Sequence, residues 1–211
     1  METKLAPHSI YAESTPNPST MKFVSNRYLI VDGEVYEFNN AKEATVSDLA
    51  AELFTFPFVT GVFIASNFVS IRKSDILEWD DVILELKTFI GDFLNAEGAK
   101  IVDAEKVQAM LADQTKEPEI TEQSSISVPR REDLTDIEGK IADILDEYIR
   151  PAVESDGGAI HFHSFKEGVV SVVLKGACSG CPSSTMTLKA GIQNLLMDML
   201  PEVKEVEAIN G

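Results

Sequence analysis

The 211-residue sequence contains few cysteines, few basic residues and no long apolar run. It has only two cysteines, Cys178 and Cys181, which is typical of a protein from a reducing compartment. No apolar run approaches the roughly 18 residues of a membrane-spanning helix, so we expect no membrane insertion. The first residues resemble neither a signal peptide nor an Arg-rich transit sequence. From these absences we expect a cytoplasmic protein.

Basic residues are outnumbered by acidic ones, 18 to 35, and the formal net charge is −17. A surface with this charge repels the phosphate backbone of nucleic acids and anionic lipid headgroups. We therefore expect no nucleic acid and no membrane among the partners. Solubility alone accounts for most of the acidic side chains.

The two cysteines form a CxxC motif, and Pro182 follows directly. The apolar run 169–174 predicts a strand before the motif. Apolar residues at helical spacing predict a helix after it, and these are Met186, Leu188, Ile192, Leu195, Leu196 and Met199. Proline suits the first turn of a helix, and the positive end of the helix favours thiolates nearby. We also expect the glycines beside the cysteines, Gly176 and Gly180, to leave the sulfur atoms uncovered.

Two thiolates are too few to complete a metal site. A tetrahedral zinc site and the common iron–sulfur clusters each require four ligands, and the chain has no third cysteine. A second copy of the chain is the simplest source of the missing pair, because a two-fold axis presents the same patch twice. A shared site near the surface would release its contents readily, which suits a carrier.

Three alternatives remain open from the residues alone. A CxxC motif before a helix is also the arrangement of a dithiol–disulfide oxidoreductase. The motif could instead be half of a zinc site, completed by His161 and His163 or by a partner in a zinc-bridged dimeric binding module. A structural disulfide is the weakest of the three in a reducing compartment.

The sequence predicts an α+β protein with two domains, residues 1–95 and 132–211, joined by residues 96–131. Within the first domain, Ser47 is expected to cap a short helix. We expect strands near residues 9–11 and 21–24, hairpins of 28–31 with 35–38 and of 59–64 with 68–73, and helices at 48–54 and 81–93. No catalytic set of side chains is evident in this domain.

The connecting segment is predicted to hold a helix at residues 103–112 and then a flexible, acidic and polar linker to residue 131. The second domain predicts the order α-β-β-α-β. Its elements are a helix from Leu134 to an end at Arg150-Pro151, strands at 159–165 and 169–174, the helix after the CxxC motif, and a strand at 203–209. His161 and His163 alternate with Ile160 and Phe162, so we expect both histidines on a solvated face.

Two segments of the second domain carry a family resemblance. Residues 149–158 (IRPAVESDGG) and 174–184 (LKGACSGCPSS) resemble the NifU-like C-terminal domain of iron–sulfur scaffold and carrier proteins. Residues 14–23 (STPNPSTMKF) resemble the Nfu N-terminal domain. Over residues 7–95 and 132–211, the chain resembles a two-domain Nfu protein.

This resemblance implies a non-enzymatic scaffold for a [4Fe–4S] cluster, or a [2Fe–2S] cluster. Upstream cluster assembly proteins would supply the cluster, and apo iron–sulfur proteins would receive it. In such proteins the CxxC cysteines bind the cluster across a homodimer, so that role would belong to Cys178 and Cys181. The first domain has no cysteine and is expected to dock targets or delivery partners.

Overall fold

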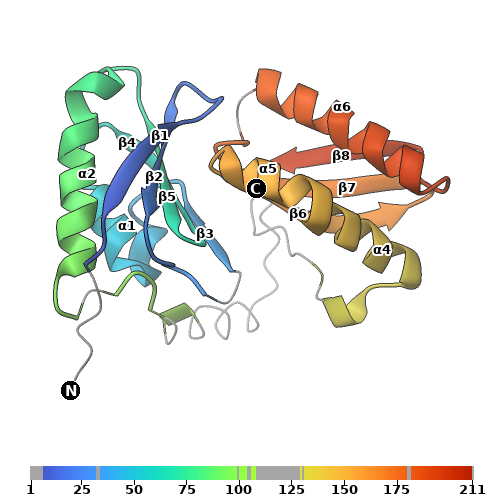
Figure 1. Ribbon diagram of the computed structural model, residues 1–211, viewed down its shortest axis with the longest axis horizontal. Coiled ribbons are helices and arrows are strands. Elements are labelled where there is room, and N and C mark those ends of the chain that lie inside the picture. Colours follow the sequence, from blue (N-terminus) through green and yellow to red (C-terminus); the bar gives the residue numbers. More distant parts are fainter. Residues whose placement is uncertain are drawn as a thin grey trace. The chain divides into compact units, whose positions relative to one another are not determined.

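The computed structural model describes residues 7–31, 34–98, 100–103, 106–107, 129, 131–179 and 182–210 (Figure 1). The chain folds as two compact units, and each contains one β-sheet with its own hydrophobic core. Both units mix helices with strands, which confirms the predicted α+β class. Among the described helices, none is both long and apolar enough to cross a membrane.

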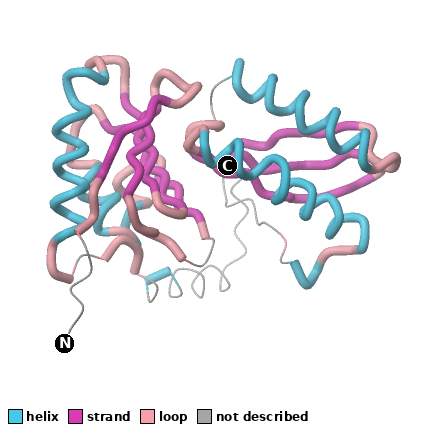
Figure 2. The backbone as a smooth tube through the Cα atoms, viewed as in Figure 1, coloured by secondary structure: helices cyan, strands magenta, loops and turns pink. Residues whose placement is uncertain are grey.

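The first unit is built on a five-stranded antiparallel sheet in the order β1-β2-β5-β4-β3. Its strands are β1 (Ile10–Ser14), β2 (Thr20–Ser25), β3 (Val35–Phe38), β4 (Val59–Ala65) and β5 (Phe68–Lys73). Two α-helices, α1 (Asp48–Leu53) and α2 (Trp79–Asn95), share a core with the sheet. Figure 2 shows α2, in cyan, lying along one side of the magenta strands.

Local sequence signals account for both of these helices. The Ser47 hydroxyl accepts a hydrogen bond from the Ala50 amide at 3.1 Å, as a helix N-cap does. The helix α2 buries Val82, Leu86, Ile90 and Leu94, which recur every four residues on one face. The predicted helices are thus confirmed, although α2 begins at Trp79 rather than at residue 81.

The predicted hairpin between residues 28–31 and 35–38 is wrong. Residues 28–31 form no strand, and β3 pairs with β4 instead. The amides of Leu29 and Ile30 donate to the Ser66 carbonyl at 2.7 and 2.9 Å, in the turn between β4 and β5. A β-rich run therefore identifies neither a strand with certainty nor the segment with which a strand pairs. The hairpin of β4 with β5 is confirmed.

The second unit follows the predicted order α-β-β-α-β. Its elements are α4 (Asp136–Ile144), η3 (Leu145–Ile149), α5 (Arg150–Ser155), β6 (Gly158–Lys166), β7 (Val169–Gly176), α6 (Pro182–Met199) and β8 (Glu205–Asn210), after a short 3₁₀ turn η2 (Arg131–Asp133). The strands β6 and β7 are antiparallel, whereas β7 and β8 are parallel. A parallel pair needs a crossover connection, and α6 supplies it. Residues of α4 and α6 pack with the sheet in one core.

The helix before β6 does not end at Arg150-Pro151 as predicted. It continues through η3, which is a π-helical turn, into α5. Pro151 falls in the first turn of α5, where the missing N–H group is tolerated. A wider helical turn therefore accommodates the proline without ending the helical path.

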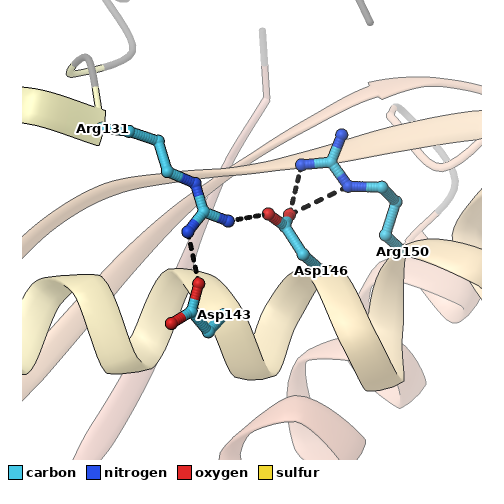
Figure 3. A network of polar contacts seen from close by, with 4 residues as sticks. All are labelled: Arg131, Asp143, Asp146 and Arg150. Carbon is cyan, nitrogen blue, oxygen red and sulfur yellow. Dashed lines mark hydrogen bonds and ion pairs between the residues drawn. The ribbon is translucent and has the colours of Figure 1, made fainter.

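A network of ion pairs holds this helical path to η2 (Figure 3). Arg131 contacts both Asp143 and Asp146, and Arg150 donates from Nε to Asp146 at 2.9 Å. Asp146 thus accepts from two arginines on different elements. The network ties the start of the unit to the helix that leads into the Gly157–Gly158 turn.

The predicted helix at 103–112 and the predicted linker lie mostly outside the described residues. Lys106 and Val107 are helical, and the Val107 amide donates to the Asp103 carbonyl at 3.0 Å. Asp103 in turn donates its amide to the Val46 carbonyl at 2.8 Å, so this segment continues the first unit.

Candidate functional site

Cys178 lies in the turn between the end of β7 and the start of α6. The predicted strand-to-helix placement is confirmed for this cysteine. Cys181 and Gly180 lie outside the described residues. The first described residue after them is Pro182, where α6 begins, so Cys181 directly precedes the helix in the sequence.

Hydrogen bonds fix Cys178 to both flanking elements. The Gly176 carbonyl accepts from the Ser179 amide at 3.1 Å and from its hydroxyl at 2.9 Å. The Thr185 hydroxyl donates to the Cys178 carbonyl at 3.1 Å, which connects the turn to the start of α6. Gly176 has a φ of 69°, a left-handed conformation that favours glycine. The backbone around Cys178 is therefore held from the strand and from the helix.

The Gly157–Gly158 turn packs directly against Cys178. Gly157 has a φ of 82°, and its carbonyl accepts from the Ala177 amide at 3.2 Å. Gly158 opens β6 opposite Gly176. A Cβ atom on Gly158 would lie only 2.9 Å from the Cys178 sulfur, closer than real Cβ atoms approach. Two motifs about twenty residues apart in the sequence therefore form one site.

The sequence-based prediction missed the role of Gly158, which appears there only within the segment 149–158 that carries the family resemblance. A tight turn with one left-handed residue requires a single glycine, and Gly157 fills that position. The second glycine of the pair was the available signal, because a glycine without a conformational role often marks a close approach. Here the close approach is to Cys178.

Cys178 is buried, with only 5% of its surface exposed. It belongs to the hydrophobic core of the second unit, together with Ile160, Leu174 and Ile192. The expectation that the glycines leave the sulfur atoms uncovered is therefore wrong for Cys178. Gly158 removes a side chain and so allows the thiol to pack closely rather than to face solvent.

The two histidines do not complete a metal site with Cys178. Among the described residues, no group of three or more His, Cys, Asp or Glu side chains could hold a metal ion. His161 and His163 both lie on β6, where the register against β7 shifts between Phe162 and Ser164. The structure therefore gives no support to a zinc site built from the histidines of one copy within its described part.

His161 is largely buried rather than solvated, contrary to expectation. Burial lowers the pKa of His161 to about 4, with smaller contributions from the positive charges of Lys175 and Arg150. Its Nε2 atom is buried and has no hydrogen-bond partner among the described residues. Strand alternation assigns a side chain to a face of the sheet, but it does not determine whether solvent reaches that face.

The start of α6 is the electropositive end of an 18-residue helix. Its first amides have no partners within the helix, so negative charge at the CxxC turn is favoured. The helix is anchored by Ile192 and Leu196, whose side chains are fully buried in the core. Cys178 therefore lies in a turn between a strand and a helix N-terminus, and both of these elements are anchored in the core.

Comparison with known proteins shows the same two-domain organisation. Residues 10–97 match the model for the scaffold protein Nfu/NifU N terminal, and residues 141–207 match the NifU-like domain. The class of each domain is therefore established independently. The chain carries both domains and therefore belongs to the Nfu family.

Relatives match over nearly the whole chain. NifU-like protein 4, mitochondrial, from Arabidopsis thaliana is 36% identical over 200 residues, covering 94% of this chain and 65% of the relative. NFU1 iron-sulfur cluster scaffold homolog, mitochondrial, from Drosophila grimshawi is also 36% identical over 200 residues, covering 95% of this chain and 61% of the relative. The chain thus spans less than two thirds of the length of these relatives.

The expectation of a cytoplasmic protein is wrong, because these relatives are named as mitochondrial. It rested partly on the small number of cysteines, which indicates a reducing environment. That environment is not unique to the cytosol, so cysteine usage cannot separate it from the interior of an organelle.

Proposed function

We propose that this protein is a non-enzymatic scaffold and carrier that binds a [4Fe–4S] cluster between two copies of the chain. The observation that supports it most is the position of Cys178, held between β7 and the N-terminus of α6 in a CxxC motif. The relatives named iron-sulfur cluster scaffold homologs support the same role. The cluster is the cargo, and Cys178 and Cys181 are its ligands.

The supply of ligands supports a homodimer. The described part of one copy offers no other group of side chains that could hold a metal ion, and the whole chain has only two cysteines. A four-iron cluster takes four thiolates, so two copies related by a two-fold axis supply the complete set. A [2Fe–2S] cluster has the same requirement and would bind in the same way.

Burial of Cys178 means that the turn must open before the sulfur can bind iron. Its carbonyl is held by Thr185 and the preceding Gly176 is held by Ser179, so the ends of the turn are anchored. Because Cys178 and Ser179 belong to the CxxC loop, opening would have to break these hydrogen bonds or rotate the Cys178 side chain while they persist. The helix α6 would remain in place, and its positive end would offset the charge of the four thiolates.

Transfer of the cluster would proceed by exchange of ligands. Thiolates of an apo iron–sulfur protein would displace Cys178 and Cys181 one at a time, without oxidation or reduction of the cluster. Loading from upstream cluster assembly proteins would follow the same exchange in the opposite direction. Neither step needs a catalytic residue, which agrees with a scaffold rather than an enzyme.

The experiment is anaerobic reconstitution of the full chain with ferric iron, sulfide and an excess of a thiol reductant, which supplies the ferrous ions of the cluster. We expect a brown dimer with about four irons, since a cube has four metal positions and two copies supply its ligands. About two irons per dimer would identify a [2Fe–2S] cluster instead. Cys181→Ser should abolish both colour and cluster-dependent dimerisation, whereas His163→Gln should retain them.

Two outcomes would contradict this proposal. One is an iron-loaded monomer, because the ligands would then come from a single chain. The other is a colourless protein whose two thiols cycle through a disulfide with a measurable reduction potential, as expected for a dithiol–disulfide oxidoreductase. Zinc in purified material would decide nothing, because zinc generally outcompetes ferrous iron at such sites.

A further inference from the structure

The first unit contains a cavity of about 490 Å³ that cluster binding does not use. It lies between α1 and the C-terminal end of α2, and the residues after α2 close one side. We propose that this cavity docks a partner protein through a short segment in which an apolar side chain is flanked by lysine or arginine. The proposal does not depend on cluster binding, because every lining residue belongs to the first unit.

Aromatic side chains form the apolar part of the cavity. Phe89 and Phe93 lie one turn apart on α2, and both are half-buried. Phe89 packs edge-on against Phe56 with ring centroids 5.2 Å apart, and it lies 6.5 Å from Phe93. Contacts within the unit therefore fix these rings in position. An apolar side chain would find a preformed surface, which lowers the entropic cost of docking.

Carboxylates form the polar part of the cavity. Asp48 and Glu52 come from α1, and Asp92 and Glu97 come from α2 and the residues after it. All four are exposed. The one lysine of the lining, Lys100, already pairs with Asp103 at 3.0 Å. The lining thus presents four carboxylates and one ammonium, and Asp103 partly balances the charge of that ammonium.

A second lysine, Lys106, lies near the cavity, and the lining remains negatively charged despite it. Lys106 approaches Asp48 at 3.7 Å, with both side chains about half exposed. Exposed pairs at such a distance are weak and are screened by salt. A partner cation can therefore compete for Asp48, and within the described part of the chain no salt bridge engages the other three carboxylates of the lining.

The negative charge of the cavity lining determines which class of partner can bind there. Nucleic acids and anionic lipids would be repelled, and a second copy of this chain, at a net charge of −17, would bring mostly acidic surface. Residues 109–112 of the chain, which lie outside the described residues, are apolar in sequence, and residues 108–112 contain no lysine or arginine. Their sequence therefore offers no positive charge to match the carboxylates of the lining. A basic segment with an apolar anchor satisfies both parts of the lining.

The test uses the full chain without cluster and a fluorescent peptide, Lys-Arg-Leu-Phe-Arg-Lys, in fluorescence anisotropy. One control peptide has glutamine in place of the basic residues, and another has alanine in place of Leu-Phe. We expect binding of the first peptide alone. At low salt, the double variant Glu52→Gln/Asp92→Asn should weaken binding about fivefold to tenfold, and the difference should shrink near 0.5 M salt.

Glu85→Gln is the matched control, because Glu85 is an exposed carboxylate of α2 that does not line the cavity. It should change the affinity clearly less than the double variant does, because it removes one charge and that charge lies outside the lining. Phe93→Ala should also weaken binding, and the fluorescence of the single tryptophan, Trp79, would show whether the first unit remains folded.

Three results would overturn the proposal. The peptide could fail to bind the full chain, or it could bind equally well to the double variant. Binding that emerges only after deletion of residues 108–112 would show that the chain fills its own cavity. A failure of cluster reconstitution would leave these measurements unaffected, so the two proposals succeed or fail separately.

Discussion

The contact between Gly158 and Cys178 makes a quantitative prediction for Gly158→Ala. The added Cβ atom would lie 2.9 Å from the Cys178 sulfur and 2.6 Å from the Lys175 carbonyl oxygen. Both distances are too short, and the second involves backbone. Lys175 belongs to β7 and is paired with Ala159, so its carbonyl cannot move without disturbing the ladder. The variant must therefore displace the cysteine, the strand end, or both.

The expected cost follows from two opposing effects. Forcing a methyl group into a packed core costs about 1–3 kcal/mol. Replacing glycine by alanine also restricts the unfolded chain, which returns about 0.4–1 kcal/mol. We expect a net loss of about 1–2 kcal/mol in the free energy of unfolding of the second unit. For a domain of this size, that lowers the melting temperature by roughly 4–16 °C, at 4–8 °C per kcal/mol.

Two signals in the same sample separate the units of the full chain. Trp79 is the single tryptophan and lies in the first unit, so its fluorescence reports unfolding of that unit. Circular dichroism reports both units, and its transition for the second unit should move to lower urea in the variant. The rate of thiol labelling at Cys178, measured in a Cys181→Ser background, should rise because the sulfur is displaced from its packing site.

Gly139→Ala and Gly191→Ala are matched controls on helices of the same unit. A Cβ atom at either position meets no heavy atom within 4 Å. Alanine should stabilise each helix by about 0.5–1 kcal/mol, the opposite sign to Gly158→Ala. If Gly158→Ala were as stable as the parent and equally slow to label, the close packing of the turn on Cys178 would be refuted.

Two further predictions concern charged groups. His161→Leu should flatten the pH dependence of stability. Burial lowers the pKa of His161 to about 4, so between about pH 6.5 and pH 4 the unfolded chain binds a proton that the folded chain excludes. The parent protein should therefore lose at most about 3 kcal/mol of unfolding free energy as the pH falls through this range, and the variant should not. Urea unfolding at several pH values would measure this, and an unchanged slope in the variant would contradict it. Asp146→Asn should cost about 0.5–1 kcal/mol at low salt, because the network in Figure 3 is partly exposed and its charges are screened. The cost should fall toward zero near 1 M salt, and a salt-independent loss would indicate a packing role instead.

The parts of the fold that could be predicted from sequence are those determined by local patterns. The helix α2 has an apolar residue at every fourth position, and α1 begins at a serine that caps it. The hairpin of β4 with β5 turns at Ser66, which adopts a left-handed φ of 42°. In each case the deciding interactions lie within a few residues, so the sequence contains them directly.

The errors in the fold concern interactions between distant residues. Whether β3 pairs with residues 28–31 or with β4 depends on competition for sheet partners, and β4 wins through a ladder from Val35–Ala65 to Phe38–Val62. The helix before β6 passes Pro151 because a π-helical turn widens the backbone there. No residue pattern marks that turn.

At the candidate site, too, local features could be predicted and contacts between distant residues could not. The CxxC spacing and the strand-to-helix context place Cys178 correctly, since both are local features. Its burial and its contact with Gly158 depend on β6 meeting β7, so they could not be read from the motif. For the same reason His161 was assigned to the correct strand but to the wrong environment.

Burial of Cys178 also bears on how tightly the proposed scaffold could hold a cluster. Exposing a small, mostly apolar side chain costs about 1 kcal/mol, and a dimer would expose two of them. A total of about 2 kcal/mol reduces the affinity by a factor of about 30. The same free energy returns when the cluster leaves and each turn closes over its sulfur. The packing that stabilises the empty fold therefore weakens retention of the cargo, which favours a protein that passes a cluster on over one that keeps it.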